Sequence, residues 1–528
     1  MGVTTGLARY RGIGRLGLIT ACSITLATLW GCGGGGGSSP SPSPPPPVAQ
    51  DFVTKATCGP GDKPETALQG QVPAALRTPG TFKGFSCNLQ LVGQSRGDGA
   101  SWQHAWFVDN AGHQCSYYDT ASATANRTHV GTVAIDATNA AAPTPTAYLT
   151  TTPMIDPWES LKVNDRRQLL GAVNALNGNG GPEIDLYDVS GDCRTPKLLA
   201  SFAVGTGADG GFRADVRGHE GAFAPDGLTY YGTNLGAGYV YPIDITNPAK
   251  PKLLTQWFTP LIQVTHGMSF SEDGNRAYFT LFGSGDSNPN GNPVTNGIVI
   301  ADTSEIQARK PDGQIKALGV FLWGSGSAAQ HTIPVKIGGK QYLIGVDEGG
   351  AGGNNLAGWT NACANGSPPW NMARIIDLSD EMHPFVVSEL KLEMNTASNC
   401  AKVIPDLAGL SGFTYGSHYC SVDNKQNTTT LACGYFESGS RVFDIRDPVH
   451  PKEIAYYNPP AVTTPSPGSQ NNRASATGRP DHCSAQVRLD ASTGMLYTTC
   501  QDNGFLALKF TNGVWPFPGV TTPPGQQN

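Results

Sequence analysis

Charged residues and long internal hydrophobic runs are scarce in this chain. Asp, Glu, Lys and Arg make up only 14% of the 528 residues. This excludes a coiled coil, because coiled coils need a charge-rich composition with abundant Ala and Leu. The net charge of -6 offers no basic face to phosphates, so we expect no nucleic-acid partner. Downstream of the N-terminal segment, no apolar run is long enough to span a bilayer.

Glycine and proline are what the chain has in excess. The 67 glycines and 40 prolines are about a fifth of the residues, and these two residues are the poorest helix formers. The composition therefore predicts a turn-rich, all-β protein. The length allows two or three average domains or one large repeat domain.

The N-terminal residues predict export. Three arginines, Arg9, Arg11 and Arg15, precede an apolar stretch at 16–30, the pattern of a signal peptide. The following Gly31-Cys32 resembles a bacterial lipobox, which implies a lipidated Cys32 after a signal peptide at 1–31. The alternative is an ordinary secretory signal. We expect a cell-envelope protein, anchored to the outer membrane or in the periplasm, or a secreted one.

A low-complexity segment follows the predicted signal. Residues 32–57 begin with five glycines after Cys32 and continue with Ser and Pro. Such a sequence cannot bury a core and is typical of a tether. The folded domain is then expected at 58–515, with a flexible tail at 516–528.

Cysteine usage also indicates an oxidising compartment. Of the twelve cysteines, Cys22 and Cys32 belong to the signal and the anchor, and the remaining ten are an even number. No C-x-x-C motif is present, which argues against a zinc ribbon. The cysteines of two pairs lie on either side of a polar turn, which predicts the disulfides Cys420–Cys433 and Cys483–Cys500. Proximity in the sequence suggests Cys58–Cys87 and Cys363–Cys400.

A repeat runs through most of the chain. Its core is an aliphatic residue, Asp and a second aliphatic residue, followed by a polar turn and a Pro-led strand. Clear copies surround Asp188, Asp244, Asp377 and Asp444, and degenerate ones surround Asp136 and Asp302. Two more short apolar strands lie upstream in each copy. Four short strands per repeat predict the blades of a β-propeller.

Counting the repeats predicts seven blades. The last repeat has only three strands, and residues 88–93, which resemble an outer strand, come directly before the first repeat. We therefore expect the N-terminal strand to complete the last blade, which would leave no free sheet edge. The longest insertions are at 283–296 and 349–370, and long loops on a rigid scaffold often carry function.

The repeat pattern resembles the LVIVD-repeat β-propellers of exported bacterial proteins over about residues 85–512. The resemblance implies the fold and the export. It implies no activity, because that family has no single established reaction and a propeller hosts many functions.

Histidines recur at one repeat position, just before the first strand of a blade. These are His104, His219, His266, His331, His418 and His482, with Glu159 at the remaining position. Because the innermost strand lines the channel, these side chains could converge and hold copper or zinc. The alternative is structural, as in WD-repeat propellers, with a turn residue such as Asn234, Glu348, Glu437 or Asp502 as the partner. The carboxylates considered as ligands or as a base are Glu159, Glu220, Glu348 and Glu437.

A second candidate metal site lies in the first long insertion. Residues 286–297 match the first half of an EF-hand loop, but the twelfth position is Gly297 rather than Glu. The sequence fits both a calcium-binding loop and a polar insertion that binds no ion.

Two functions fit these observations. One is a monomeric binding or interaction scaffold of the envelope, which captures a protein or ligand through its long loops. The other is a copper- or zinc-dependent propeller enzyme, for example an oxidoreductase, built on the histidine ring. Lactonase-type hydrolysis is a third reading, from fold analogy alone.

Overall fold

The structure is a computed structural model that describes residues 51–120, 128–175, 182–202, 218–235, 238–260, 264–408, 410, 412–464 and 480–523. The chain divides into two compact units, Met1–Pro47 and Val48–Asn528. The predicted signal peptide, its lipidation site Cys32 and most of the predicted tether lie outside the described residues.

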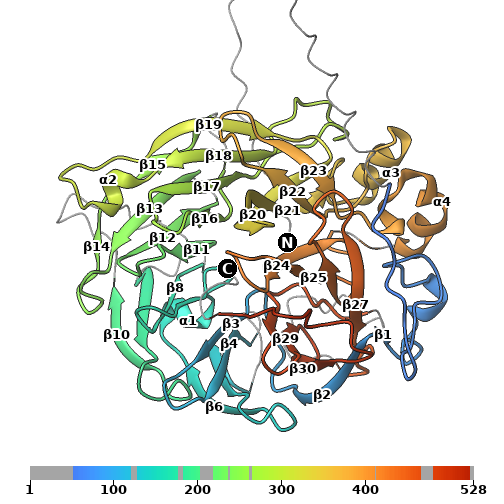
Figure 1. Cartoon of the computed structure of the whole chain (residues 1–528), viewed down its shortest axis with the longest axis horizontal. Helices are drawn as coiled ribbons and strands as arrows, with labels where there is room; N and C mark the ends of the chain where they lie inside the picture. The colour runs from blue at the N-terminus through green and yellow to red at the C-terminus, as the bar shows by residue number, and fades with distance from the viewer. Residues whose placement is uncertain are drawn as a thin grey trace, which may run out of the picture. The chain divides into compact units, whose positions relative to one another are not determined.

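The second unit is a seven-bladed β-propeller of antiparallel sheets around a central channel (Figure 1). The first three blades are β3–β6 (Ala105–Val108, Gln114–Asp119, Thr132–Asp136, Thr144–Leu149), β7–β10 (Lys162–Asn164, Leu169–Val173, Ile184–Asp188, Lys197–Phe202) and β11–β15 (Gly221–Phe223, Thr229–Asn234, Tyr239–Asp244, Lys252–Leu253, Trp257–Phe258). In the third blade the outer strand is split, because β14 and β15 both pair with β13.

The other four blades follow in chain order. They are β16–β19 (Met268–Phe270, Arg276–Leu281, Gly297–Asp302, Lys316–Leu322), β20–β23 (Gly326–Ile337, Lys340–Gly350, Ala373–Asp377, Phe385–Glu389), β24–β27 (Ser417–Val422, Thr430–Tyr435, Ser440–Asp444, Lys452–Asn458) and β28–β30 (Arg488–Asp490, Met495–Cys500, Gly504–Phe510). The seven-bladed fold predicted from the repeats is confirmed.

The predicted closure by an N-terminal strand is also confirmed. Strand β2 (Leu89–Ser95) pairs with β30 and supplies the fourth strand of the last blade. Strand β1 (Phe85–Cys87) adds a fifth strand to the neighbouring blade by pairing with β27. Both contacts join the start of the propeller to its end.

The repeated Asp has a local structural role at the end of the third strand. In each of six blades its Oδ1 accepts a hydrogen bond from the backbone N–H two residues later, at 2.8–3.1 Å. This Asx turn starts the connection to the outer strand. The residue directly after the Asp donates its backbone N–H toward the start of the second strand, as Ile245 does to the carbonyl oxygen of Leu228 at 2.9 Å. The motif is therefore a turn signal.

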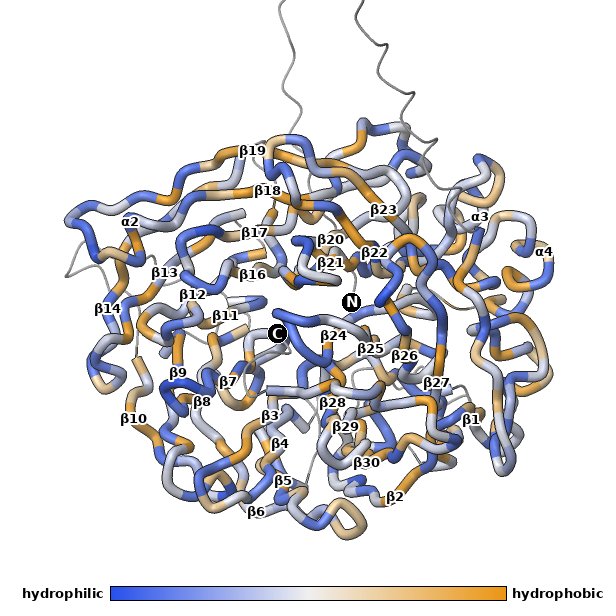
Figure 2. Tube along the Cα trace, in the orientation of Figure 1, coloured by the Kyte–Doolittle hydropathy of each residue, from blue (hydrophilic) through white to orange (hydrophobic). Residues whose placement is uncertain are grey.

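The apolar core is divided among the contacts between blades. One cluster joins Phe107 and Tyr117 of the first blade to Leu170 and Tyr187 of the second. Another joins the third blade to the fourth. Figure 2 shows apolar segments distributed around the ring rather than gathered at one centre. This leaves the channel to polar side chains.

Five disulfides hold the described chain. The four predicted pairs, Cys58–Cys87, Cys363–Cys400, Cys420–Cys433 and Cys483–Cys500, are all present. The fifth joins Cys115 of the first blade to Cys193 of the second.

The ends of the predicted propeller extend beyond 58–515. Within the segment assigned to the tether, Val53 is buried and donates its backbone N–H to Lys391 at 2.8 Å. Within the segment assigned to the tail, Thr522 Oγ1 accepts the backbone N–H of Ala491 at 2.9 Å. These contacts place parts of both segments on the propeller surface.

The helices of the described residues are short and lie in the connections. They are α1 (Thr152–Ile155), α2 (Ser304–Gln307), α3 (Leu356–Ala364), α4 (Cys400–Val403) and the 3-10 turns at Ala74–Leu76, Glu393–Asn395, Ala397–Asn399 and Ile404–Leu407. None of the described helices is long and apolar enough to cross a membrane.

Candidate metal centre

Three of the repeated histidines and Glu159 meet at one point of the channel. His219 and His266 lie two residues before the first residues of β11 and β16, His418 is the second residue of β24, and Glu159 precedes β7. A parallel bridge between Glu159 and Glu220 holds the entries of the second and third blades side by side. The structure therefore brings four of the seven ring positions together.

The donor atoms lie a few tenths of an ångström closer together than ligands around one ion. Glu159 Oε2 is 3.0 Å from Nε2 of His219 and 2.9 Å from Nε2 of His266. The two Nε2 atoms are 3.0 Å apart. With bonds of about 2.0–2.1 Å, tetrahedral ligands around zinc are about 3.4 Å apart. The triad Glu159, His219 and His266 thus forms one face of a candidate site.

A second face adds His418 and Glu348. Nε2 of His418 is 3.0 Å from Glu159 Oε1 and 3.2 Å from Glu348 Oε2. Glu348 Oε2 also lies 4.0 Å from Nε2 of His266. The two oxygens of Glu159 join the two triads, Glu159–His219–His266 and Glu159–Glu348–His418, which lie side by side and share this carboxylate.

Two of the imidazoles are fixed through their other nitrogen. His266 Nδ1 is 3.0 Å from Glu220 Oε2, and His418 Nδ1 is 3.0 Å from the backbone carbonyl oxygen of Ser484. Each acceptor takes the Nδ1 proton and turns Nε2 toward the cluster. This is the usual arrangement of metal-binding histidines, which donate the proton of the other nitrogen to a carboxylate or carbonyl.

Glu220 is itself held by two donors. Tyr419 donates its hydroxyl to Glu220 Oε2 at 2.6 Å, and Lys162 Nζ lies 3.3 Å from Glu220 Oε1. The Lys162 ammonium also lies 5.1 Å from the centre of the Tyr419 ring. This network fixes the carboxylate that orients His266.

Without an ion, the cluster must hold protons. Burial lowers the pKa of His418, but the hydrogen bonds and charges of Glu159 and Glu348 outweigh it and raise the pKa to about 9. Burial opposes and the charge of Glu159 favours protonation of His266, and the net effect raises its pKa well above the usual value. The same imidazoles offset the burial of Glu159 and lower its pKa.

The charges balance with one divalent ion. With neutral imidazoles, the carboxylates of Glu159, Glu220 and Glu348 and the ammonium of Lys162 carry a net charge of two negative. Two protons on the imidazoles balance this charge, and so does one divalent cation. Because unbalanced buried charge is very costly, the site is suited to exchange two protons for one ion.

Aromatic rings surround the cluster. Phe282 stacks on His266 at 5.5 Å, Trp102 lies 5.5 Å from His418, and Trp158 lies 5.7 Å from His219. Trp158, directly before Glu159, has a φ of 49°, which is rare for a bulky residue. Such strain is concentrated at functional sites. The rings displace water and strengthen the electrostatic interactions inside the cluster.

The other three ring histidines lie apart from the cluster. His104 Nδ1 is 2.9 Å from the carbonyl oxygen of Gln486, and His331 Nδ1 is 2.5 Å from Oε1 of Gln330. His482 Nε2 is 3.8 Å from Glu437, which pairs with Arg77. The structure therefore does not bring these three predicted ligand positions into the cluster, and metal binding by them stays a prediction.

Most residues of the cluster are among the candidates that the sequence predicts. Glu220 and Glu348 were among the candidate carboxylates, and Glu348 was also the type of turn partner expected for a structural histidine. Lys162, Tyr419 and Gln330 were not anticipated. Tyr419 could have been found, since it directly follows His418 on an innermost strand.

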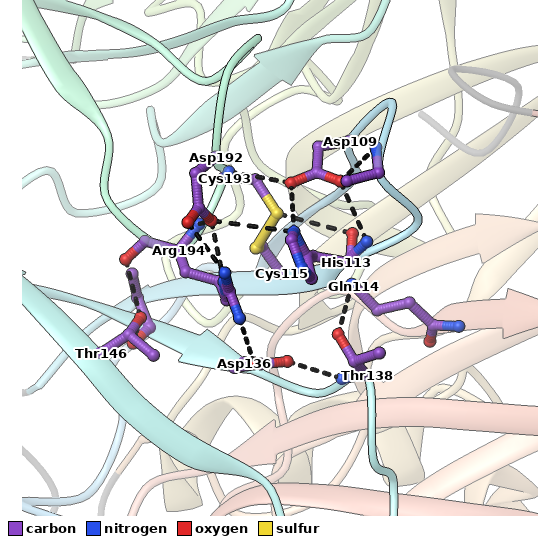
Figure 3. Close-up of a disulfide and its surroundings, with 12 residues drawn as sticks. Asp109, His113, Gln114, Cys115, Asp136, Thr138, Thr146, Asp192, Cys193 and Arg194 are labelled. Atoms are coloured by element: carbon purple, nitrogen blue, oxygen red, sulfur yellow. Dashed lines mark hydrogen bonds and ion pairs between the residues drawn. A yellow bond between two sulfur atoms is a disulfide. The ribbon is translucent and has the colours of Figure 1, made fainter.

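A second group of metal-ligand types, Asp109, His113 and Asp192, lies at the Cys115–Cys193 disulfide (Figure 3). Its acceptors are already engaged. Asp109 accepts the His113 Nδ1 proton at 2.8 Å, and Arg194 donates to both oxygens of Asp192 at 2.8 and 2.9 Å. The Arg194 hydrogen bonds lower the pKa of Asp192 to about 2. We read this group as a support for the disulfide.

The predicted calcium loop at 286–297 folds on its own side chains. Asn288 Oδ1 accepts the backbone N–H of Asn290 and Asn292, and its amide donates to the carbonyl oxygens of Gly285 and Asn292. No group of three ligand residues is found in this loop, all of which is described. Calcium binding at this loop stays a prediction.

Comparisons with known proteins find likenesses to solved structures at low identity. No protein-family model matches the sequence, and no curated protein matches it. Similar solved structures include a Lactobacillus plantarum protein (12% identity, TM-score 0.45, 72% of this chain and 86% of that one). They also include a candidate 6-phosphogluconolactonase from Bacteroides uniformis (13%, 0.45, 76% and 93%) and the Swd1 propeller domain of Myceliophteria thermophila (9%, 0.43, 80% and 100%).

Proposed function

We propose that this protein is a metal-dependent enzyme of the bacterial cell envelope, with one copper or zinc ion at the channel mouth. The ligands are His219, His266 and His418, with Glu159 and Glu348. The observation that carries the proposal is the pair of donor triads that share Glu159, in which two imidazoles are turned inward by hydrogen bonds at Nδ1.

The donor set favours copper or zinc over other ions. Imidazole nitrogen with carboxylate oxygen suits both metals. The ten cysteines of the described residues are all in disulfides, so none of them supplies a thiolate. Copper would add one-electron redox chemistry, whereas zinc would polarise a bound water or a carbonyl.

Partial exposure of two ligands supports catalysis over a structural ion. The side chains of His219 and Glu348 are 20% and 12% exposed, whereas those of His266 and His418 are fully enclosed. Structural zinc sites are closed, and catalytic sites keep a position for water or substrate. The fixed imidazoles would hold the ion while the exposed edge exchanges its ligand.

Elemental analysis of the untagged mature protein tests the proposal. We expect about one copper or zinc ion per chain, and loss of that ion in the His266→Ala/His418→Ala double variant. His104→Ala is the matched control, because His104 occupies the same repeat position and bonds to the carbonyl oxygen of Gln486 outside the cluster. Copper would be followed by oxidase and reductase assays, and zinc by ester and lactone hydrolysis. No metal after incubation with either ion would refute the proposal.

The scaffold function is a second candidate, favoured by the two long insertions. Ser287 of the first donates to Ser367 of the second at 2.9 Å, and the Cys363–Cys400 disulfide pins α3. This rigid surface exposes Leu356. In a crosslinking experiment, Leu356→Asp should abolish partner capture and leave metal content unchanged. Unchanged crosslinks would count against this second candidate.

Anchoring through Cys32 is part of the same proposal. The variant Cys32→Ser should appear in the soluble periplasmic fraction, whereas the unchanged chain should remain with the membranes. Equal distribution of the two would indicate an ordinary secretory signal.

A further inference from the structure

The channel holds a separate cavity beside the metal cluster. Its volume is about 380 Å³, and residues from the innermost strand of every blade line it. Glu220 and Lys162 belong to the lining, and Glu220 also holds His266 of the cluster. The cavity therefore begins one layer of side chains away from the candidate ion.

One part of the lining is apolar and aromatic. Trp106 of β3, Phe223 of β11 and Phe270 of β16 contribute rings, and Ile333 and Val487 contribute aliphatic side chains. Binding cavities of this size bury most of a small ligand against such walls, with a few polar groups to fix its orientation.

The other part of the lining is cationic. Lys162, Lys425 and Arg488 face the cavity, and Lys162 is paired with Glu220. For the Lys425 and Arg488 side chains, no hydrogen bond or ion pair to another described residue is found, and Arg488 Nε is buried without an acceptor. A buried guanidinium nitrogen without an acceptor is costly, and a bound anion would satisfy it.

The carboxylates of the lining do not balance these cations. Asp165 is the carboxylate that interacts electrostatically with both Arg488 and Lys425. Burial raises its pKa to about 6 despite these two cations. The neighbouring His104 and His331 are uncharged, since burial lowers their pKa values to about 4 and about 3. Arg166 and Glu272 also line the cavity, but both are exposed and their charges are opposite. Apart from these two and the Lys162–Glu220 pair, two cations face one carboxylate.

We propose that this cavity binds an organic anion, with its carboxylate or sulfonate group at Arg488 and Lys425 and its apolar body against Trp106, Phe223 and Phe270. Guanidinium groups bind such planar or tetrahedral oxyanions through two parallel hydrogen bonds. The site is distinct from the ion's ligands and does not depend on the identity of the metal.

Binding of 1-anilinonaphthalene-8-sulfonate, an apolar anion whose fluorescence rises on burial, tests the proposal. We expect saturable binding of one molecule per chain. The double variant Arg488→Met/Lys425→Met should weaken it by at least tenfold. Lys509→Met is the matched control, because Lys509 is exposed on the last blade away from the cavity. Thermal unfolding of all three proteins verifies that they are folded.

Competition then identifies the chemistry of the ligand. Benzenesulfonate and benzoate should displace the probe, whereas the neutral isostere benzamide should not. Sodium sulfate at matched ionic strength should displace it at least tenfold less well than benzenesulfonate. Equal displacement by sulfate would reduce the site to a simple oxyanion site and refute the organic ligand. Probe binding that the double variant leaves unchanged, or no saturable binding, would refute the site itself.

Discussion

Two arcs of the same ring of repeat positions differ in chemistry. Histidines at three positions, His219, His266 and His418, lie within 3.0 Å of Glu159. At two of the others, His104 and His331, the imidazoles bond to a carbonyl or an amide oxygen. The pKa values move in opposite directions, to about 9 for His418 and to about 3 for His331. The repeat brings a histidine to the channel, and the neighbouring carboxylates decide what it can bind.

The remaining histidine position, His482, shows how a neighbouring carboxylate can be kept from binding a metal. Glu348 and Glu437 lie at or just after the ends of the second strands of adjacent blades. Glu348 faces His418, whereas Glu437 is paired with Arg77 of the N-terminal extension at 2.5 Å. An arginine from outside the repeats therefore neutralises one arc and leaves the other available for a metal.

The largest effect on metal binding is expected from substituting a histidine in one arc, compared with substituting a histidine in the other arc. His266→Asn should weaken metal binding by roughly a thousandfold, because it removes a buried donor from the centre of the cluster. His104→Asn, whose imidazole bonds to the Gln486 carbonyl oxygen, should leave the affinity within about threefold of the unchanged protein. Competition with a chelator of known affinity measures both. Equal losses in the two variants would contradict the division of the ring.

Arg77→Met should destabilise the fold at the opposite arc of the ring. It leaves the Glu437 carboxylate buried without its partner, and breaking a buried pair in this way costs about 3–5 kcal/mol of unfolding free energy. Denaturant unfolding of the metal-free protein measures it. Arg446→Met, which removes a half-exposed pair with Asp444, is the control and should cost less than about 1 kcal/mol. Similar losses would mean that Arg77 has no special role.

Glu220→Gln sharpens the comparison without removing a ligand. The amide still fits between Tyr419 and His266, but it no longer carries the charge that orients and polarises the imidazole. Replacing such a supporting carboxylate typically lowers metal affinity by about 10–100-fold. An isothermal titration of the metal-free protein measures the change. An unchanged affinity would show that Glu220 serves the fold rather than the ion.

The smallest effect is a pH dependence of the metal-free protein. Because the folded pKa of His418 is about 9 and its usual value is 6.5, its protonation stabilises the fold fully below pH 6.5. That contribution is lost as the pH rises through about 9. His266 acts in the same direction. The melting temperature should therefore fall by about 2–5 °C over this interval. Metal-loaded protein should show a flatter profile, and a rise with pH in the metal-free form would contradict the assignment.

Much of the fold could be predicted because its signals are local. The Asx turn at Asp244 and its counterparts marks the end of each third strand, and the hairpin flanked by Cys420 and Cys433 sets their pairing. The division of the histidine ring could not be predicted in this way. It depends on contacts such as that of Arg77 with Glu437, which are 360 residues apart, and on which side chains meet across the channel.

The central claim is that one ion is bound by His219, His266 and His418. Crystals of the copper- and zinc-loaded protein, measured at the absorption edge of each metal, test it directly. We predict one anomalous peak about 2.0–2.2 Å from the three Nε2 atoms, with Glu159 within bonding distance. The absence of a peak there, or a peak at Asp109, His113 and Asp192 instead, would contradict the account.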